Sequence, residues 1–197
     1  MGLPLRDRQR HTYGEYLTWP EDARYELIAG EAYLMAPAPD LVHQDVAGEV
    51  FSQIHTQLAG KPCRAFVAPV DVRLPKSNEA DDQIDTVVQP DVLVVCDPSK
   101  LDRRGVRGAP DWVLEVLSPS TAGHDQVLKR LIYERAGVRE FWLVHPMDRV
   151  LTIYRLDGVE YGKPDVQELK GFTEIRLLPG VIVAWDALAE RLPRPEY

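Results

Sequence analysis

The spacing of apolar residues predicts two long helices that each bury one face. Between residues 41 and 59, apolar side chains recur at four-residue intervals, which is typical of an amphipathic helix. A second helix is expected over residues 125–136, where Gly137 stands at the position that favours a left-handed C-terminal residue. Helices of this kind indicate a domain in which helices pack on a sheet.

Before the first long helix, the pattern predicts a short helix and a hairpin. Thr12 and Glu15 have the spacing of a capping box, which favours a short helix over residues 12–18. Residues 24–28 and 31–35 are expected to form two strands joined by a tight turn at Ala29-Gly30.

Several other apolar runs have the length and composition of strands. Residues 64–74 predict one strand that Pro75 ends, whereas the acidic segment 76–86 shows no period and is interpreted as a mobile loop over a site or a solvated excursion. The remaining predicted strands cover residues 92–96, 112–117, 140–144, 150–156, 159–161, 175–177 and 181–183.

Two neighbouring apolar runs each carry one carboxylate. Asp91 opens the run 92–96, and Glu115 lies near the end of the run 112–117. The segment between them is rich in Asp, Arg, Gly and Pro and has no helical period, so an antiparallel pairing is expected. Antiparallel pairing brings both acids to the same end of the sheet.

Two carboxylates in a mostly apolar sheet cost several kcal/mol to desolvate unless positive charge accompanies them. Hard oxygen ligands suit Mg²⁺ or Mn²⁺, so a divalent metal site is one interpretation. In the alternative, Asp91 caps a turn after Pro90 and Glu115 pairs with an arginine at a sheet edge.

Length and composition fit one folded domain. The chain has 197 residues, of which 45% are hydrophobic and 27% charged. We expect one domain over residues 12–192, with tails at 1–11 and 193–197. No apolar run approaches membrane-spanning length and the start has no apolar signal core, so a cytoplasmic location is expected, with Cys63 and Cys96 as buried reduced thiols.

The formal net charge of -8 is unfavourable for binding nucleic acid over a broad surface. Much of the acid lies in residues 79–85 and in the C-terminal half, whereas Arg103, Arg104 and Arg107 cluster between the two acid-bearing strands. A local basic surface is therefore compatible with the acidic total.

Taken together, motifs along the chain resemble the Uma2 family of restriction-endonuclease-like proteins, part of the PD-(D/E)xK nuclease superfamily. The resemblance covers residues 13–192. The motifs that carry it are Tyr25-Glu26-Leu27-Ile28 with Gly30-Glu31, Pro37-Ala38-Pro39, His43-Gln44, 68–74, Pro90-Asp91, 115–121, Lys129, Tyr133 and 136–144.

The resemblance implies an α/β (α+β) fold with a restriction-endonuclease-like core, in which a mixed central sheet is flanked by helices and extended by an N-terminal hairpin and C-terminal strands. It implies a Mg²⁺- or Mn²⁺-dependent endonuclease that hydrolyses DNA phosphodiester bonds. Asp91 and Glu115 are then catalytic metal ligands, and the backbone carbonyl of Val116 is a further ligand.

The main departure from the superfamily pattern concerns its lysine. In most members a lysine follows two residues after the glutamate, and here that position is Leu117. Lys129, on the following predicted helix, is the candidate replacement for the catalytic amine. In the alternative, Lys129 is a surface residue paired with Asp125, four positions earlier.

Other polar residues are candidates for accessory roles. Asp71 is a candidate for completing the metal shell or orienting a water, or it belongs to a solvated strand face. His43 is a candidate for proton transfer or phosphate contact, or has a structural role at a helix start. Glu31, Glu49 and Ser118 are weaker candidates.

A second hypothesis comes from a different class of protein. A nuclease fold without activity would serve as a nucleic-acid-binding or oligomerising module, and both Leu117 and the acidic charge balance favour it. A homodimer is expected, because the terminal strands offer edges for association and a dimer would let two sites cut two strands. The sequence has no phosphate-binding glycine loop, HExxH or GxSxG motif.

Overall fold

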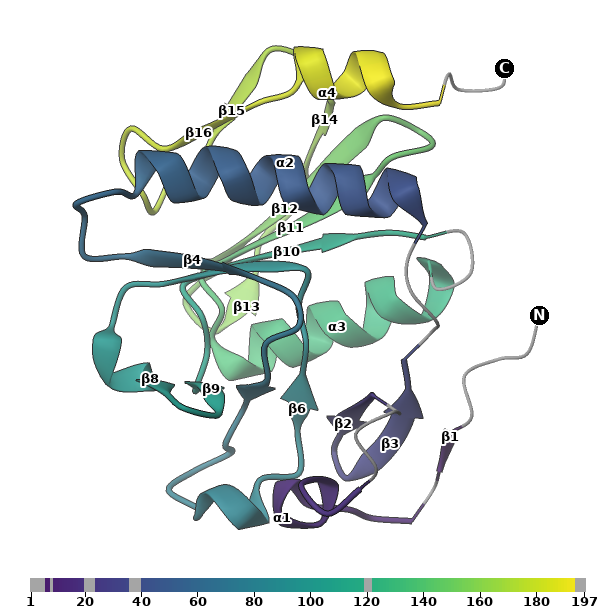
Figure 1. Cartoon of the computed structure of the whole chain (residues 1–197), viewed down its shortest axis with the longest axis vertical. Coiled ribbons are helices and arrows are strands. Elements are labelled where there is room, and N and C mark those ends of the chain that lie inside the picture. Colours follow the sequence, from purple (N-terminus) through teal and green to yellow (C-terminus); the bar gives the residue numbers. More distant parts are fainter. Residues whose placement is uncertain (1–5, 8, 20–23, 36–39, 119–121, 194–197) are drawn as a thin grey trace.

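A central mixed sheet lies between two long helices, in an α+β arrangement (Figure 1). The computed structural model describes residues 6–7, 9–19, 24–35, 40–118 and 122–193. Helix α2 (Leu41–Gln57) covers one face of the sheet, and α3 (Ala122–Ala136) covers the other. Both helices were predicted, and α3 ends as expected, with Gly137 at a φ of 87°.

The central sheet brings the two acid-bearing strands together in the predicted antiparallel sense. Leu114 pairs with Val92, so Glu115 and Asp91 occupy the next positions at one end of the strand pair. Strands β10 and β11 are parallel, and the other pairs are antiparallel. In order across the sheet, the strands are β13 (Glu160–Tyr161), β12 (Val150–Asp157), β11 (Glu140–His145), β10 (Trp112–Val116), β7 (Val92–Val95) and β4 (Arg64–Val67), and β14 (Asp165–Glu168) also pairs with β12.

Alternation along β10 divides its side chains between two apolar layers. Trp112 and Leu114 pack with α2, whereas Val113 and Leu117 pack with Tyr133 of α3. Glu115 shares the α3 side with Val113 and Leu117, as a two-residue period requires.

The C-terminal segment adds a third layer outside α2 (Figure 1). It consists of β15 (Phe172–Glu174), β16 (Ile182–Ala184) and α4 (Asp186–Arg191). Gln53 and Gln57 of α2 hydrogen-bond the backbone of Ala184 and Ile182. The helix thereby supplies partners for backbone N–H and C=O groups on one edge of β16. The prediction of a strand at 175–177 was wrong, and β14 and α4 were not predicted.

A second sheet forms beneath α3 from the N-terminal hairpin and the connections between central strands. The hairpin was predicted, and Ala29 and Gly30 adopt the positive φ angles of 50° and 85° that a tight turn requires. In order, the strands are β1 (Arg6–Asp7), β3 (Glu31–Leu34), β2 (Tyr25–Ile28), β6 (Val87–Val88), β5 (Val72–Arg73), β9 (Gly105–Arg107) and β8 (Leu101–Asp102). Helix α1 (Tyr13–Tyr16), with the predicted capping box of Thr12 and Glu15, and the 3-10 turns η1 (Asp81–Gln83) and η2 (Pro98–Lys100) complete this part.

Residues 64–74 do not form one strand, contrary to the prediction. The chain leaves the central sheet after β4 and enters the second sheet at β5. Pro69 lies between them and has no N–H to continue a ladder, which explains the break.

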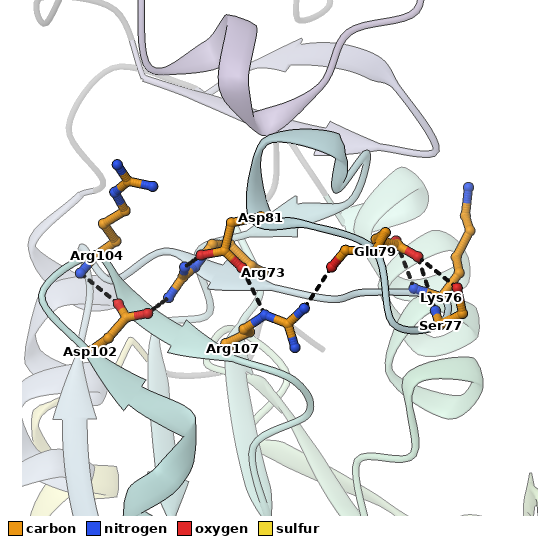
Figure 2. A network of polar contacts seen from close by, with 8 residues as sticks. All are labelled: Arg73, Lys76, Ser77, Glu79, Asp81, Asp102, Arg104 and Arg107. Atoms are coloured by element: carbon orange, nitrogen blue, oxygen red, sulfur yellow. Dashed lines mark hydrogen bonds and ion pairs between the residues drawn. The ribbon is translucent and has the colours of Figure 1, made fainter.

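The acidic segment 76–86 is tied to the second sheet by ion pairs (Figure 2). Arg73, which is fully buried, contacts both Asp81 and Asp102, and Arg107 donates to Asp81 at 2.7 Å. The Arg107 guanidinium also donates to the backbone carbonyl of Glu79. Within this segment, the carboxylate of Asp81 is thereby neutralised by arginines, and that of Asp85 pairs with Lys76.

The two cysteines form a disulfide, so the expectation of reduced thiols was wrong. Arg64 pairs with Val95 across antiparallel strands β4 and β7, which places Cys63 and Cys96 opposite each other at the next position. This pairing across 33 residues depends on strand register and is not visible in the spacing of the cysteines. Within the part of the chain that the structure describes, no helix is long and apolar enough to cross a membrane.

Candidate active site

Asp91 lies at the start of β7, where the sheet and the first turn of α2 meet. Its Oδ2 accepts the backbone N–H of Val116 at 2.8 Å, which fixes the carboxylate against the neighbouring strand. Nε2 of His43 lies 3.1 Å from the same oxygen. His43 reaches this position because Asp40 caps α2 and accepts the His43 backbone N–H at 2.8 Å.

Glu115 is buried between β10 and α3, with 6% of its surface exposed. Its Oε1 accepts two hydrogen bonds, from Lys129 Nζ at 3.0 Å and from the Tyr133 hydroxyl at 2.5 Å. Lys129 and Tyr133 are four positions apart, so both project from the same face of α3 toward the strand. Lys129 is thus a buried residue with 7% exposure, and not a surface lysine.

Leu117, at the position where the superfamily has its lysine, is itself buried. It packs in the apolar cluster with Val113, Tyr133 and Phe141. An ammonium at that position would be buried in this cluster, whereas Lys129 brings its ammonium to Glu115 from the helix.

Glu26 of the N-terminal hairpin joins the same centre, although it was not predicted as a site residue. Its Oε1 accepts the Lys129 ammonium at 2.9 Å and the Gln89 backbone N–H at 2.8 Å. The side chain is buried, with 7% of the residue exposed. The available signal in the sequence was a charged residue inside an otherwise apolar strand, beside the buried Leu27 and Ile28.

The electrostatics of the centre reflect an excess of negative charge. The pKa of Glu115 is raised to about 8, chiefly by burial; the charge of Lys129 opposes this rise, whereas the charges of Asp91 and Glu26 add to it. Burial lowers the pKa of His43, but its hydrogen bond to Asp91 and that carboxylate's charge outweigh burial and raise it overall. Burial, followed by the charge of Glu115, raises the pKa of Tyr133 well above its ordinary value.

The donor set fits a hard divalent cation in charge and chemistry. Asp91, Glu115 and Glu26 each use one carboxylate oxygen for the contacts above, and in the described part of the chain no hydrogen bond reaches the second oxygen of any of them. Unengaged carboxylate oxygens are the ligands that Mg²⁺ and Mn²⁺ prefer. Within the same residues, no group of three or more His, Cys, Asp or Glu side chains could hold a metal ion, so the fit concerns the chemistry of the donors.

The other candidates lie outside this contact group. Asp71 accepts the Tyr13 hydroxyl at 3.1 Å and the Gln89 side-chain amide at 2.9 Å, and Gln89 in turn donates its backbone N–H to Glu26. Glu31 accepts the hydroxyl of Tyr33, its neighbour on the hairpin.

Glu49 also lies apart from these contacts. Glu49 interacts with Gln53 and Arg191 on the outer side of α2, and these contacts lower its pKa. Ser118 follows β10 and is partly exposed. The alternative pair of Asp125 with Lys129 depends on the Asp125 side chain, which lies outside the described part of the structure. Ser120 and Thr121 also lie outside the described residues.

The predicted arginine cluster is only partly available to a ligand. Arg107 is engaged by Asp81 and Glu79, whereas the Arg104 side chain extends away from this network (Figure 2). Arg103 and Arg104 are exposed.

A solved structure has the same fold. It is the crystal structure of "a putative nuclease belonging to DUF820" from Anabaena variabilis ATCC 29413, with a TM-score of 0.71 and 21% sequence identity, covering 91% of this chain and 97% of that chain. The likeness places the chain in a nuclease-type fold class. The profile of the Uma2 family, described as "Putative restriction endonuclease", matches residues 13–186, and the chain therefore belongs to this family. A comparison with curated proteins finds no match.

Proposed function

We propose that this protein is a divalent-metal-dependent endonuclease that hydrolyses DNA phosphodiester bonds. The observation that supports the proposal most directly is the position of Lys129, whose Nζ lies 3.0 Å from Glu115 Oε1 although Leu117 occupies the expected lysine position. Family membership and the shared fold support the same reaction class.

In this proposal Asp91 and Glu115 hold Mg²⁺ or Mn²⁺, with the backbone carbonyl of Val116 as a further ligand. A divalent cation in such a site supplies a lowered pKa for the attacking water and stabilises charge on the phosphoryl group in the transition state. The hydrogen bond from Val116 N–H holds Asp91 Oδ2 in place, which leaves Oδ1 for the ion.

Lys129 supplies the positive group that acts on the substrate. Its buried ammonium is held between Glu26 and Glu115, so its position is fixed before DNA binds. There it holds the attacking water or neutralises the scissile phosphate. Tyr133 shares Glu115 Oε1 with Lys129 and orients that carboxylate.

The test is cleavage of supercoiled plasmid and linear DNA in Mn²⁺ and in Mg²⁺, with a chelator control. We expect metal-dependent cutting by the wild type, a loss of at least about 100-fold in Asp91→Asn, and a similar loss in Lys129→Met. Lys100→Met is the matched control, because Lys100 donates to the Ala109 carbonyl away from the site. Circular dichroism and thermal melting establish that each variant is folded.

The rival function is a nuclease fold that binds nucleic acid or oligomerises without cutting it. Leu117 and the net charge of -8 favour this rival. Folded wild-type protein that cuts no DNA form above the Asp91→Asn background, while binding DNA equally well in both, would replace the nuclease with the binding module.

A further inference from the structure

His43 lies beside Asp91 but has no part in the reaction proposed above. It stands in the first turn of α2, where Asp40 accepts its backbone N–H, and 11% of its side chain is exposed. Its Nε2 lies 3.1 Å from Asp91 Oδ2. An ionised carboxylate only accepts hydrogen bonds, so Nε2 carries a proton and is the donor of this contact.

The second ring nitrogen of His43 has no such contact. Nδ1 is buried and receives or donates no hydrogen bond among the described residues. An unpaired buried polar atom costs free energy, so packing alone gives no reason for a histidine at this position. The hydrogen bond to Asp91 is therefore what distinguishes His43 from an apolar residue of similar size.

The surroundings of the two ring nitrogens decide among the roles that the sequence left open. Proton transfer to a substrate, or contact with a phosphate, requires a ring nitrogen that the substrate can reach. Nε2 is engaged by Asp91, and Nδ1 is buried. His43 must then act through Asp91 and not on DNA directly.

Asp91 Oδ2 accepts hydrogen bonds from two different elements. Val116 N–H donates from β10 at 2.8 Å, and His43 Nε2 donates from α2. Two donors that reach one oxygen from a helix and a strand oppose rotation of the carboxylate, because rotation would break both hydrogen bonds. Without His43, Val116 N–H alone would hold the side chain.

We propose that His43 is a positioning residue, which fixes the orientation of Asp91 by tying its Oδ2 to the first turn of α2. The direction of Oδ1 is then set before any ligand binds. The positioning stands on the contacts of the protein itself, and only its effect on DNA cleavage rests on the proposed function.

The first test measures the position of Asp91 without metal or DNA, through hydrogen exchange of the Val116 amide in the full-length protein. His43→Gln places an amide nitrogen at about the position of Nε2, whereas the shorter side chain of His43→Asn does not reach Asp91. We expect Val116 exchange to become about tenfold faster in His43→Asn, because a hydrogen bond to a charged group is lost. In His43→Gln it should stay close to the wild-type rate.

Three controls make the exchange specific to Asp91. The Leu117 amide donates to the Val144 carbonyl and not to Asp91, so its exchange should not change. Asp91→Ala gives the exchange rate of Val116 without the carboxylate. His55→Asn is the matched substitution, because His55 is an exposed histidine on the same helix.

Two results of the exchange measurement would overturn the proposal. One is a Val116 amide that exchanges equally in the wild type and in His43→Asn. The other is equal acceleration of Val116 and Leu117, because the substitution would then loosen the end of β10 and not the carboxylate.

DNA cleavage provides the second readout and separates this inference from the proposed nuclease. We expect His43→Asn to lower kcat by about 10- to 100-fold with little change in KM for DNA, and His43→Gln to recover most of the loss. An equal loss in both variants would overturn the role of the Nε2 donor. Faster Val116 exchange in His43→Asn, in a protein whose wild type cuts no DNA, supports the positioning and removes the nuclease.

Discussion

At the scale of single residues, one carboxylate oxygen explains much of the candidate site. Glu115 Oε1 accepts hydrogen bonds from Lys129, on one turn of α3, and from Tyr133, on the next turn. The lysine that contacts the glutamate therefore comes from a helix, and Leu117 packs in the apolar core. A chain without a lysine at the superfamily position can therefore still place a lysine amine beside the glutamate.

The burial of Glu115 has a consequence for stability against pH. Its pKa is raised from 4.5 to about 8 in the fold, mainly by burial, so the folded protein binds this proton more tightly than the unfolded chain does. The stabilising contribution is full below about pH 4.5 and is lost as the pH rises through about 8. In the presence of chelator, we expect the free energy of unfolding to fall over this window.

Urea denaturation of the wild type and of Glu115→Gln between pH 4.5 and 8.5 measures the contribution of Glu115 to the free energy of unfolding. The wild type should lose stability relative to the variant as the pH rises, and saturating Mg²⁺ should remove much of the loss. The pKa of His43 is also raised, which makes stability fall with rising pH in the same way, but His43 is present in both proteins. A difference between the two proteins that stays constant across the window would contradict the assignment.

At the scale of elements, the site depends on the close approach of β9 to β5. Val106 N–H donates to the Asp71 carbonyl at 2.9 Å, and a Cβ on Gly105 would lie 2.3 Å from that carbonyl oxygen. Gly105 also has a φ of 110°, which side chains rarely adopt. Asp71 directly precedes β5 and accepts hydrogen bonds from Tyr13 and Gln89. A displacement of β5 would therefore also displace Gln89, which lies two residues before Asp91.

Two glycines in the same hairpin allow a matched test. Gly108 also has a positive φ, of 94°, but its Cβ would meet only the Lys100 side chain at 4.0 Å. We expect Gly108→Ala to cost about 1 to 3 kcal/mol from backbone strain alone. Gly105→Ala should cost more, about 3 kcal/mol or above, because a backbone carbonyl must also move. Denaturant midpoints measure both, and equal costs would show that the contact with Asp71 does not matter.

At the scale of the whole molecule, the net charge of -8 opposes a polyanionic substrate. Part of this charge is internally compensated, as in the contacts of Asp81 and Asp102 with Arg73. Part is concentrated at the candidate site, where a bound cation would reverse its effect on phosphate. DNA binding should therefore depend on divalent metal more than on a broad basic surface.

Fluorescence anisotropy with a labelled duplex tests this dependence, with Ca²⁺ as the probe cation. The wild type should bind more tightly in Ca²⁺ than in chelator. In chelator above about pH 8, where Glu115 is ionised, the double variant Asp91→Asn, Glu115→Gln should bind about tenfold more tightly than the wild type, because two site charges that repel phosphate are removed. Substitution of the exposed Glu160 and Glu168 by glutamine removes the same charge elsewhere. An equal gain in that control would show that only the total charge matters.

The sequence alone determined the elements whose pattern is local. The apolar period predicted α2 and α3, the capping box predicted α1, and Ala29-Gly30 predicted the hairpin turn. Antiparallel pairing of the strands that follow Asp91 and contain Glu115 followed from the composition of their connection. These features depend on residues close together in the chain.

Tertiary structure decided the contacts between segments that are distant in the sequence. Glu26 meets Lys129 across 103 positions, and no local period indicates that a hairpin glutamate faces a helix lysine. The Cys63–Cys96 disulfide and the transfer of the chain from β4 to β5 depend likewise on strand register and sheet order. The sequence supplied the carboxylates and the lysine, and packing of the hairpin and α3 against the central sheet brought them together, because burial and charge compensation act through space.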